Sequence, residues 1–596
     1  MEAGVSHRVL CRPRPALPLI QFKPGVALPF MSKVLTGIAA AVMGLALTGS
    51  IARPARAADS NDSSVPTITA VLNNYSYILP GNPNYGIAPG SIFVIFGTGL
   101  AAPGSPAVLQ NSVCPVPPGD CQGLPLTLNG ASVTVTVAGL SVQPALYYAT
   151  PMQIAAVLPS ITPLATGTVT VTYNGVTSQP ATLQVVQSAL GIATMSGDGT
   201  GPAMATDANY NFISPTNSAA AGQIITLWGT GLGAGTADSD TTYTATPHQI
   251  TSVPLTFLVL EDGQAPAIVW AGRSGYPGLD QINIQIPVGD IPAPVWVNGY
   301  PSYPPWITVP VGCSVPLMAA DSGTGVGSNT VTLPIAVIGG TCAQPSFVLD
   351  PSVAQALGSQ ATVNVGSLSV SQYAGQALAG GYFGSMSGSA LAAFAGSAAV
   401  SEGSCIVVPP YGSYQAGGLN AGGSIALNGP AGQQPLTTGD YADYGGIMPA
   451  STIPAGGGTF TFVSGSGQYA TIGTFNTPVK TPAALDWTNQ NSIGTIKRSQ
   501  GVRLTWTGGD ANGVVAIRGS SFAAAGSPTP STSFMCSVPA SADQFTVPAS
   551  ILQALPAGPG TLTLENRSAP QAISTTGLDI GNAFAGAMFT INAAYN

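Results

Sequence analysis

Short runs in which apolar and polar residues alternate recur along most of the chain, separated by turns rich in glycine, proline and asparagine. The clearest runs are residues 132–137 (Ser-Val-Thr-Val-Thr-Val) and 168–173 (Thr-Val-Thr-Val-Thr-Tyr), and an Asn-Gly pair stands beside each of them. A period of two predicts half-buried β-strands, and Asn-Gly is typical of hairpin turns. The pattern therefore predicts an all-β protein made of antiparallel β-sandwiches, with helix limited to a short turn or two.

One long stretch occurs twice. Residues 88–100 read Ala-Pro-Gly-Ser-Ile-Phe-Val-Ile-Phe-Gly-Thr-Gly-Leu, and residues 221–232 read Ala-Gly-Gln-Ile-Ile-Thr-Leu-Trp-Gly-Thr-Gly-Leu. Each copy predicts a turn, a short apolar strand with one half-exposed face, and a sharp corner at Gly-Thr-Gly-Leu. A Pro-Leu pair and a Gln-Ile pair follow both copies in the same order, at an offset of roughly 130 residues, the length of one domain. We infer a tandem duplication, whose matching apolar positions should point into the core: Phe93, Ile95, Ile225 and Leu227.

These landmarks divide the chain into four folded units. The two copies of the duplication occupy residues 65–190 and 191–336. The remainder carries alternating runs on a different plan, and a proline-containing stretch at 478–482 predicts a boundary within it. We therefore expect a β-rich domain at 345–478 and a C-terminal β-sandwich at 482–596.

The order of motifs over residues 65–336 resembles a known family. Ala-Pro-Gly-Ser-Ile, Phe-Gly-Thr-Gly-Leu, Pro-Leu, Leu-Tyr-Tyr, Gln-Ile and Asn-Gly-Val-Thr-Ser follow one another in the first copy. This order is similar to an uncharacterised domain family of exported Acidobacteria (Solibacter-type) proteins, and the Gly-Thr-Gly-Leu corner is similar to IPT/TIG immunoglobulin-like domains. The resemblance implies tandem immunoglobulin-like antiparallel β-sandwiches in an exported protein. It implies no activity, because the family has no catalytic residues to carry over.

The N-terminal segment reads as an export signal. Met31-Ser32-Lys33 is followed by an apolar run at 34–47 and by Ala-Arg-Ala at 55–57, which is the order of a secretory signal peptide. A membrane anchor is the alternative, but the run is shorter than a bilayer span requires. We expect a signal peptide at 31–57, preceded at 1–30 by a mis-assigned start. The mature chain would then be secreted, extracellular or on the cell surface, with the periplasm also open, and without membrane insertion.

Charge excludes several classes of partner. Only 6% of the residues are charged, and removal of residues 1–57 leaves 21 acidic and 7 basic residues, a net charge of −14. Arg273 is the one basic residue between position 57 and Lys480. So few cations offer no footprint for nucleic acid and no attraction to an acidic membrane surface.

Six of the seven cysteines follow the predicted cleavage site. An even number in an exported chain predicts disulfides, whereas the absence of any C-x-x-C pair disfavours a metal site. Pairing of neighbours along the sequence is the simplest arrangement and gives Cys114–Cys121, Cys313–Cys342 and Cys405–Cys536.

The sequence offers little catalytic chemistry. His248 is the only histidine after the signal, and no G-x-S-x-G nucleophile motif occurs. Asp238 and Asp240 form an oxygen-rich stretch that suits calcium, although a solvated loop explains them as well. We expect no catalytic residues, no cofactor and no metal ligands.

The leading hypothesis is an exported non-catalytic protein, not an enzyme, with a structural or adhesive role at the cell surface or outside the cell. The alternative is a polysaccharide-binding protein that uses an aromatic loop containing Tyr300, Tyr303 and Trp306. A hydrolase whose carboxylates meet only in the folded protein is a third hypothesis. Extracellular polysaccharide and surface proteins are the expected partners, and nucleic acid is not.

Overall fold

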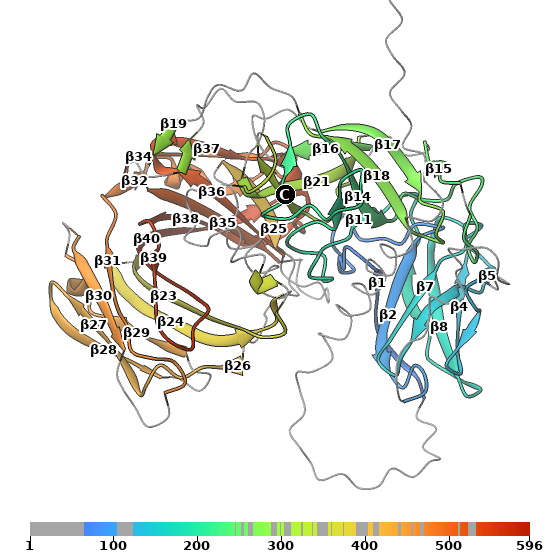
Figure 1. Ribbon diagram of the computed structural model, residues 1–596, viewed down its shortest axis with the longest axis horizontal. Coiled ribbons are helices and arrows are strands. Elements are labelled where there is room, and N and C mark those ends of the chain that lie inside the picture. The colour runs from blue at the N-terminus through green and yellow to red at the C-terminus, as the bar shows by residue number, and fades with distance from the viewer. Residues whose placement is uncertain are drawn as a thin grey trace, which may run out of the picture.

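Strands form nearly all of the regular structure in the computed structural model of the chain (Figure 1). The structure describes residues 65–103, 123–244, 246–251, 255–259, 266–287, 295–297, 300–302, 312–322, 326–336, 338–342, 356–358, 360–373, 375–388, 403–408, 417–438, 443–454, 457–464, 470–510, 513–522 and 532–596. The signal peptide, Cys114 and Cys121 lie outside these residues, as do Tyr303 and Trp306.

Repeat 1, which comprises β1 to β10, is a sandwich of two antiparallel sheets. The first sheet has the spatial order β1 (Thr67–Asn73), β2 (Ile92–Thr98), β7 (Gln153–Val157) and β6 (Ala145–Ala149). The second has the order β10 (Ala181–Gln184), β8 (Thr166–Tyr173), β4 (Ala131–Val137) and β3 (Thr127–Leu128), with β5 (Leu140–Val142) beside β4 and β9 (Val176–Thr177) beside β8.

Repeat 2, which comprises β11 to β22, has the same plan. Its first sheet has the order β11 (Gly191–Ile192), β14 (Ile224–Thr230), β18 (Asp280–Gln285), β17 (Ala267–Arg273) and β15 (His248–Gln249), with β12 (Ala205–Thr206) beside β14. The second has the order β13 (Ala219–Ala220), β22 (Val331–Ala336), β21 (Gly312–Asp321) and β16 (Leu255–Val259). A separate hairpin pairs β19 (Val295–Val297) with β20 (Tyr300–Ser302).

The strand order identifies both repeats as immunoglobulin-like. Immunoglobulin domains place strands A, B, E and D in one sheet and C, F and G in the other. In repeat 1 these are β1-β2-β7-β6 and β4-β8-β10, and in repeat 2 they are β11-β14-β18-β17 and β16-β21-β22. The fold class predicted from the sequence is confirmed, because two copies of one strand plan follow each other along the chain.

The predicted core positions are confirmed. Phe93 and Ile95 are fully buried in the core of repeat 1, and Ile225 and Leu227 occupy the corresponding places in repeat 2. The opposite face of β2 differs from the prediction of a half-exposed surface, since Val94 is also fully buried. Each of these strands is therefore covered on both faces.

The Gly-Thr-Gly-Leu corner has a steric basis in both repeats. A Cβ on Gly97 would overlap the carbonyl oxygen of Thr67, and one on Gly229 would lie 2.6 Å from that of Gly191. Strand B therefore requires glycine where strand A crosses closely. Leu100, which follows the corner in repeat 1, is fully buried and closes the end of the core.

A third, larger unit follows. One 15-stranded sheet has the path β25 (Ser404–Val408), β36 (Thr532–Pro539), β35 (Val514–Ser521), β38 (Gly558–Arg567), β40 (Ile580–Tyr595), β23 (Val363–Tyr373), β24 (Gln376–Met386), β29 (Asp443–Met448), β28 (Gly432–Thr438), β27 (Ser424–Gly429), β30 (Thr459–Ser464) and β31 (Asn476–Lys480). Beside this path lie β26 (Gly417–Gly418), β33 (Thr495–Ile496) and β39 (Gln571–Ala572). A three-stranded sheet of β32 (Leu485–Trp487), β34 (Val502–Gly508) and β37 (Gln544–Val547) completes the unit.

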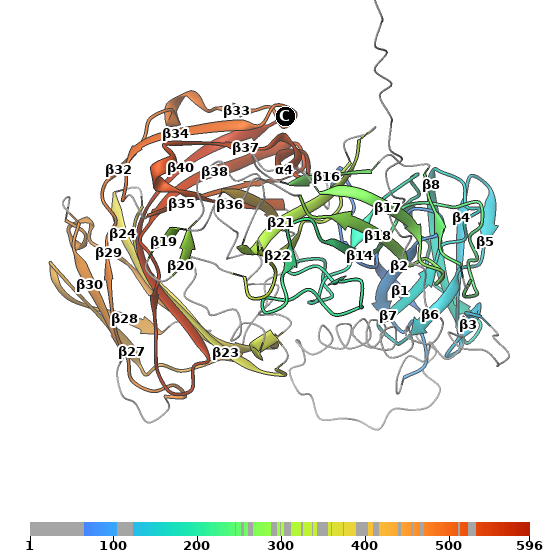
Figure 2. The same ribbon diagram turned by 45° about the horizontal axis from the view of Figure 1, so that its top comes forward.

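The long sheet serves two cores. Its β23–β31 part curls until β31 approaches β40, and it encloses a core that includes Phe383, Phe460 and Phe462. Its β25–β38 part packs against the three-stranded sheet around a core that includes Trp487 and Trp506. Strand β40 continues from one part into the other (Figure 2).

This arrangement differs from two separate domains divided at 478–482. The stretch does separate most residues of the two cores, but β40 supplies Ala583 and Ala585 to the first core and Tyr595 to the second. Cys405, from the first segment, packs in the second core because β25 pairs with β36. Pairing between strands far apart in the sequence leaves no local signal, so the shared sheet could not be predicted.

The helices named among the described residues are short, as expected: α4 (Ala549–Gln553) and the 3₁₀ turns η2 (Ala450–Thr452), η3 (Gln490–Ser492) and η4 (Ala540–Ala542). Within the described ranges, no helix has the length and apolar character needed to cross a bilayer.

Truncation of Phe93 to alanine should lower the free energy of unfolding by about 3–5 kcal/mol, because it leaves a cavity in a fully packed core. Chemical denaturation would measure this loss. Ile161→Ala is the matched control, since Ile161 is 70% exposed in the same repeat. Equal losses in the two variants would contradict the assigned core.

Candidate functional site

The two repeats meet through a buried aromatic cluster. Repeat 1 contributes Tyr75, Tyr147 and Tyr148, and repeat 2 contributes Trp228 and Tyr276. All five side chains are at most 7% exposed. Burial raises the pKa of each of the four tyrosines above its ordinary value, because a phenolate would lose its hydration. The outer faces of the duplicated sheets therefore form an interface, and not a solvent-exposed surface.

Hydrogen bonds fix the register of this interface. The Tyr147 hydroxyl donates to the carbonyl of Pro277 (2.7 Å), and the Ile92 amide donates to the hydroxyl of Thr230 (2.8 Å). Thr230 belongs to the second Gly-Thr-Gly-Leu corner, whereas Ile92 belongs to the first copy of the repeated stretch. The duplicated motif is thus used twice, once as a domain corner and once as a docking contact.

The single cation of this region lies at the edge of the interface. The Arg273 guanidinium, 2% exposed, forms an ion pair with Asp280 through Nη1 and contacts the Asp238 carboxylate at 3.3 Å. It also donates from Nη2 to the carbonyl oxygen of Gly233 (2.8 Å). His248 Nε2 lies 2.6 Å from Asp238 Oδ1. We call Arg273, Asp238, Asp280 and His248 the Arg273 cluster.

Burial sets the electrostatics of the cluster. It raises the pKa of Asp280 to about 6, more than the pairing with Arg273 lowers it. Burial lowers the pKa of Arg273, but the carboxylates of Asp280 and Asp238 raise it by a larger amount. The pKa of the guanidinium is therefore above its ordinary value, and the group stays charged. Nearby Asp240 also has a raised pKa because it is buried, and it accepts hydrogen bonds from the amide and hydroxyl of Ser160 in repeat 1.

Gly90 of repeat 1 closes the cluster from the other side. It is the glycine of the Ala-Pro-Gly-Ser motif and has a φ of 72°. A Cβ at this position would lie 2.9 Å from Asp238 Oδ2 and 3.0 Å from Arg273 Nη2. Repeat 1 therefore approaches the ion pair so closely that only glycine fits.

The contacts of the Arg273 cluster indicate a structural role. The oxygens of Asp238 accept from Arg273, from the amide of Gly235 (2.6 Å) and from His248, and one oxygen of Asp280 accepts from the amide of Leu232 (2.8 Å). The His248–Asp238 contact resembles half of a catalytic triad, but its carboxylate is already neutralised by a guanidinium. In the stretch predicted to suit calcium, these contacts occupy the oxygens of Asp238, and the oxygens of Asp240 accept from Ser160. Among the described residues, no three or more histidines, cysteines or acids gather as metal ligands.

The predicted aromatic loop is only partly described. Tyr300 begins β20 and pairs with Val297 of β19. Tyr303 and Trp306 lie outside the described residues, so the polysaccharide-binding loop stays a prediction. The sequence singled out Arg273 as a lone cation, Asp238 as part of an oxygen-rich stretch and His248 as a lone histidine, but it did not predict that they lie together. Asp280 stands directly before the Gln-Ile pair and gave no signal of its own.

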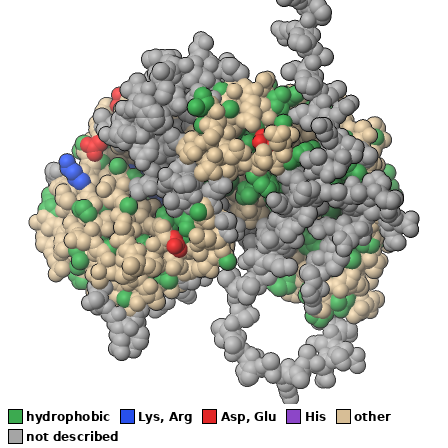
Figure 3. Space-filling view, viewed as in Figure 1, with side chains coloured by type: hydrophobic (Ala, Val, Ile, Leu, Met, Phe, Trp, Pro, Cys, Tyr) green, Lys and Arg blue, Asp and Glu red, His purple; other side chains and the backbone are tan. Residues whose placement is uncertain are grey.

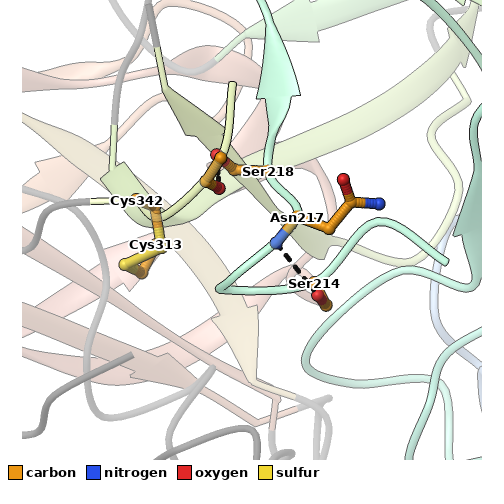
Figure 4. The surroundings of a disulfide bond; sticks show 6 residues. Ser214, Asn217, Ser218, Cys313 and Cys342 are labelled. Atoms are coloured by element: carbon orange, nitrogen blue, oxygen red, sulfur yellow. Dashed lines mark hydrogen bonds between the residues drawn. A yellow bond between two sulfur atoms is a disulfide. The ribbon is translucent and has the colours of Figure 1, made fainter. Parts of the chain in front are cut away.

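Two disulfides occur among the described residues, and both are pairings suggested by the order of the cysteines. Cys313 and Cys342 join the start of β21 to the segment after β22 (Figure 4). Beside this bridge, the Cys342 amide donates to the carbonyl of Pro215, and the Ser218 hydroxyl donates to that of Gly340. Cys405 and Cys536 face each other across β25 and β36, with their Cα atoms 4.0 Å apart.

No protein-family model and no curated protein matches the chain. Among solved structures, it is similar to a tetra-tandem repeat from the extending region of a large adhesion protein, at 12% identity over 89% of this chain and 99% of that one, with a TM-score of 0.11. It is also similar to domains of titin, at 9% identity over 68% and 94% of the two chains and a TM-score of 0.12. A third is SGBP-B from a Bacteroides ovatus mixed-linkage glucan utilization locus, at 10% identity over 83% and 90% and a TM-score of 0.13. Superpositions this poor carry no argument about function.

Gly90→Ala should destabilise the protein more than Gly139→Ala. Both glycines have left-handed φ values, of 72° and 83°, so both variants incur a backbone cost of about 1–2 kcal/mol. Only the methyl group at position 90 displaces Arg273 and Asp238, whereas nothing lies within 4 Å of one at position 139. Chemical denaturation compares the two losses, and equal losses would show that Gly90 does not pack on the Arg273 cluster.

Acidification should stabilise repeat 2 through Asp280. Its pKa is about 6 in the folded protein against an ordinary value of 3.8, so the folded state binds this proton more tightly. The corresponding stability is fully present below pH 3.8 and is lost as the pH rises through about 6. The thermal midpoint should therefore rise between pH 7 and pH 5, and this rise should be smaller in Asp280→Asn. Exposed Asp486→Asn is the control and should keep the full rise; an unchanged rise in Asp280→Asn would refute the assignment.

Proposed function

We propose that the protein is an exported, non-catalytic component of the cell surface or the extracellular matrix, with a structural or adhesive role. The observation that carries this proposal is the interface between the repeats. Its buried tyrosines and its polar contacts pack two immunoglobulin-like sandwiches against each other. Tandem sandwiches packed in this way suit load-bearing and the presentation of binding surfaces.

Two further observations support an extracellular role. The disulfides Cys313–Cys342 and Cys405–Cys536 suit an oxidising compartment. Among the described residues on the face in view, charged side chains are few and scattered (Figure 3). Such a surface suits uncharged or weakly charged partners such as neutral polysaccharides and other surface proteins.

The non-catalytic assignment rests on how the buried ionisable groups are used. Within the part of the chain that the structure describes, Asp238 and His248 form a carboxylate–imidazole contact beside Asp280, and Arg273 together with backbone amides satisfies the carboxylates. A glycosidase needs two carboxyl groups facing a substrate-sized space, whereas Asp238 and Asp280 both face the guanidinium. Their arrangement supports a structural site.

Incubation of the purified mature chain with insoluble polysaccharides and whole cells tests the proposal. We expect saturable binding to at least one surface and no hydrolysis products by mass spectrometry. Turnover of any glycan or peptide would refute the non-catalytic role. The variant Trp306→Ala tests the alternative of a polysaccharide-binding protein. If the unchanged chain binds polysaccharide and this variant does not, the binding belongs to the predicted aromatic loop.

A further inference from the structure

A cleft of about 310 Å³ opens where the two parts of the long sheet meet. One wall is the end of the β23–β24 hairpin, with Gln372, Tyr373 and Gly375, and the other wall contains Gln490 of η3. Residues 587–590 of β40 form the floor. The volume lies at the lower end of the range of ligand sites, about 300–1,000 Å³.

The cleft lies over a gap in the hydrogen-bond ladder of β40. Pairing with β23 ends at Met588, and pairing with β33 begins at Ala594. The Ala594 amide donates to Gly494 on this edge, so the alternation of a strand directs the backbone groups of Thr590 and Asn592 to the same edge. None of the strands that the structure describes pairs with the edge between these limits, and Thr590, which lines the cleft, can therefore present its amide and carbonyl groups to a ligand.

The lining is polar but uncharged. Gln372 and Gln490 each offer an amide that can both donate and accept, and Thr590 adds a hydroxyl that is also hydrogen-bonded to the hydroxyl of Thr563. Tyr373, Met588 and Phe589 contribute apolar surface beside these groups. Such a mixture matches a saccharide, whose hydroxyls donate and accept and whose ring faces present C–H groups to aromatic side chains.

Charge selects against acidic saccharides. None of the residues lining the cleft is charged. On the neighbouring strand β38, Arg567 is paired with buried Glu565, at 2.7 Å. The predicted mature chain, with a net charge of −14, would also repel polyanions.

We propose that this cleft binds one or two units of a neutral saccharide chain. The inference rests on the proposed non-catalytic function and adds the chemical class of its ligand and a site distinct from the Tyr300–Trp306 loop.

Titration calorimetry of the purified chain tests the site with cellohexaose, xylohexaose, mannohexaose and maltohexaose, and with oligogalacturonate as the charged probe. At least one neutral probe should bind, and oligogalacturonate should not. Tyr373→Ala and Gln490→Ala should each weaken that binding by about tenfold or more, because each removes a contact and exposes an unpaired partner. The matched controls are Phe522→Ala and Gln571→Ala, which alter exposed residues outside the cleft and should bind as the unchanged chain does.

Circular dichroism checks that the variants fold, and Gln372→Ala, at an exposed lining position, replaces any variant that does not. Absence of binding to all four neutral probes would overturn the proposal. Equal binding of oligogalacturonate, or binding that persists in both Tyr373→Ala and Gln490→Ala, would overturn it as well. Hydrolysis of a probe would instead refute the non-catalytic function while leaving the cleft as the binding site.

Discussion

The buried guanidinium of Arg273 constrains the first half of the molecule more than any other single group. A cation at 2% exposure is stable only when its charge and its donors are satisfied, and loss of one partner of such a pair costs about 3–5 kcal/mol. Asp280 on β18 and the loop that carries Gly233 and Asp238 meet this demand from repeat 2. Gly90 then brings repeat 1 against the same charges. The ion pair therefore fixes a loop, a strand end and a neighbouring domain together.

The aromatic interface also joins the two repeats, through apolar contacts. Tyr147 and Tyr148 lie on β6 at a shift in the strand register, and both side chains pack in the cluster between the repeats, whereas Leu146 and Ala149 pack in the core of repeat 1. Both are 7% exposed because repeat 2 covers this sheet. Separation of the repeats would break the packing of the tyrosines against Trp228 and remove Gly90 from the Arg273 cluster. Independent motion of the two sandwiches is thus opposed by both hydrophobic and electrostatic terms, and this coupling favours a rigid role over a flexible tether.

The sequence predicted what depends on local chemistry. Alternation placed strands such as β4 and β8, and glycine spacing placed the corner after Phe93 and Ile95 with the correct inward face. The sequence did not predict the features that depend on contacts between distant segments. Val94 and Trp228 occupy positions that alternation assigns to an outer face, and they are buried only because another part of the chain covers them. The partners of Arg273 and the open edge of β40 likewise follow from pairings that leave no trace in neighbouring residues.

The shared strand β40 links the second half of the molecule to its proposed site. Strand β40 has sixteen residues, which is long enough to pass from one core to the next. Strand β25 crosses in the opposite direction to pair with β36, and this pairing explains why the Cys405–Cys536 bridge spans the 478–482 stretch. One strand cannot keep the same neighbour through both cores, so β23 leaves its edge at Met588 before β33 takes it up at Ala594. Open α/β sheets bind ligands where neighbouring strands diverge, because backbone groups and space become available together. The gap beside Tyr373 and Gln490 follows the same physical logic in an all-β sheet, since the change of partners that joins the two cores leaves part of the β40 edge beside the cleft without a partner among the described strands.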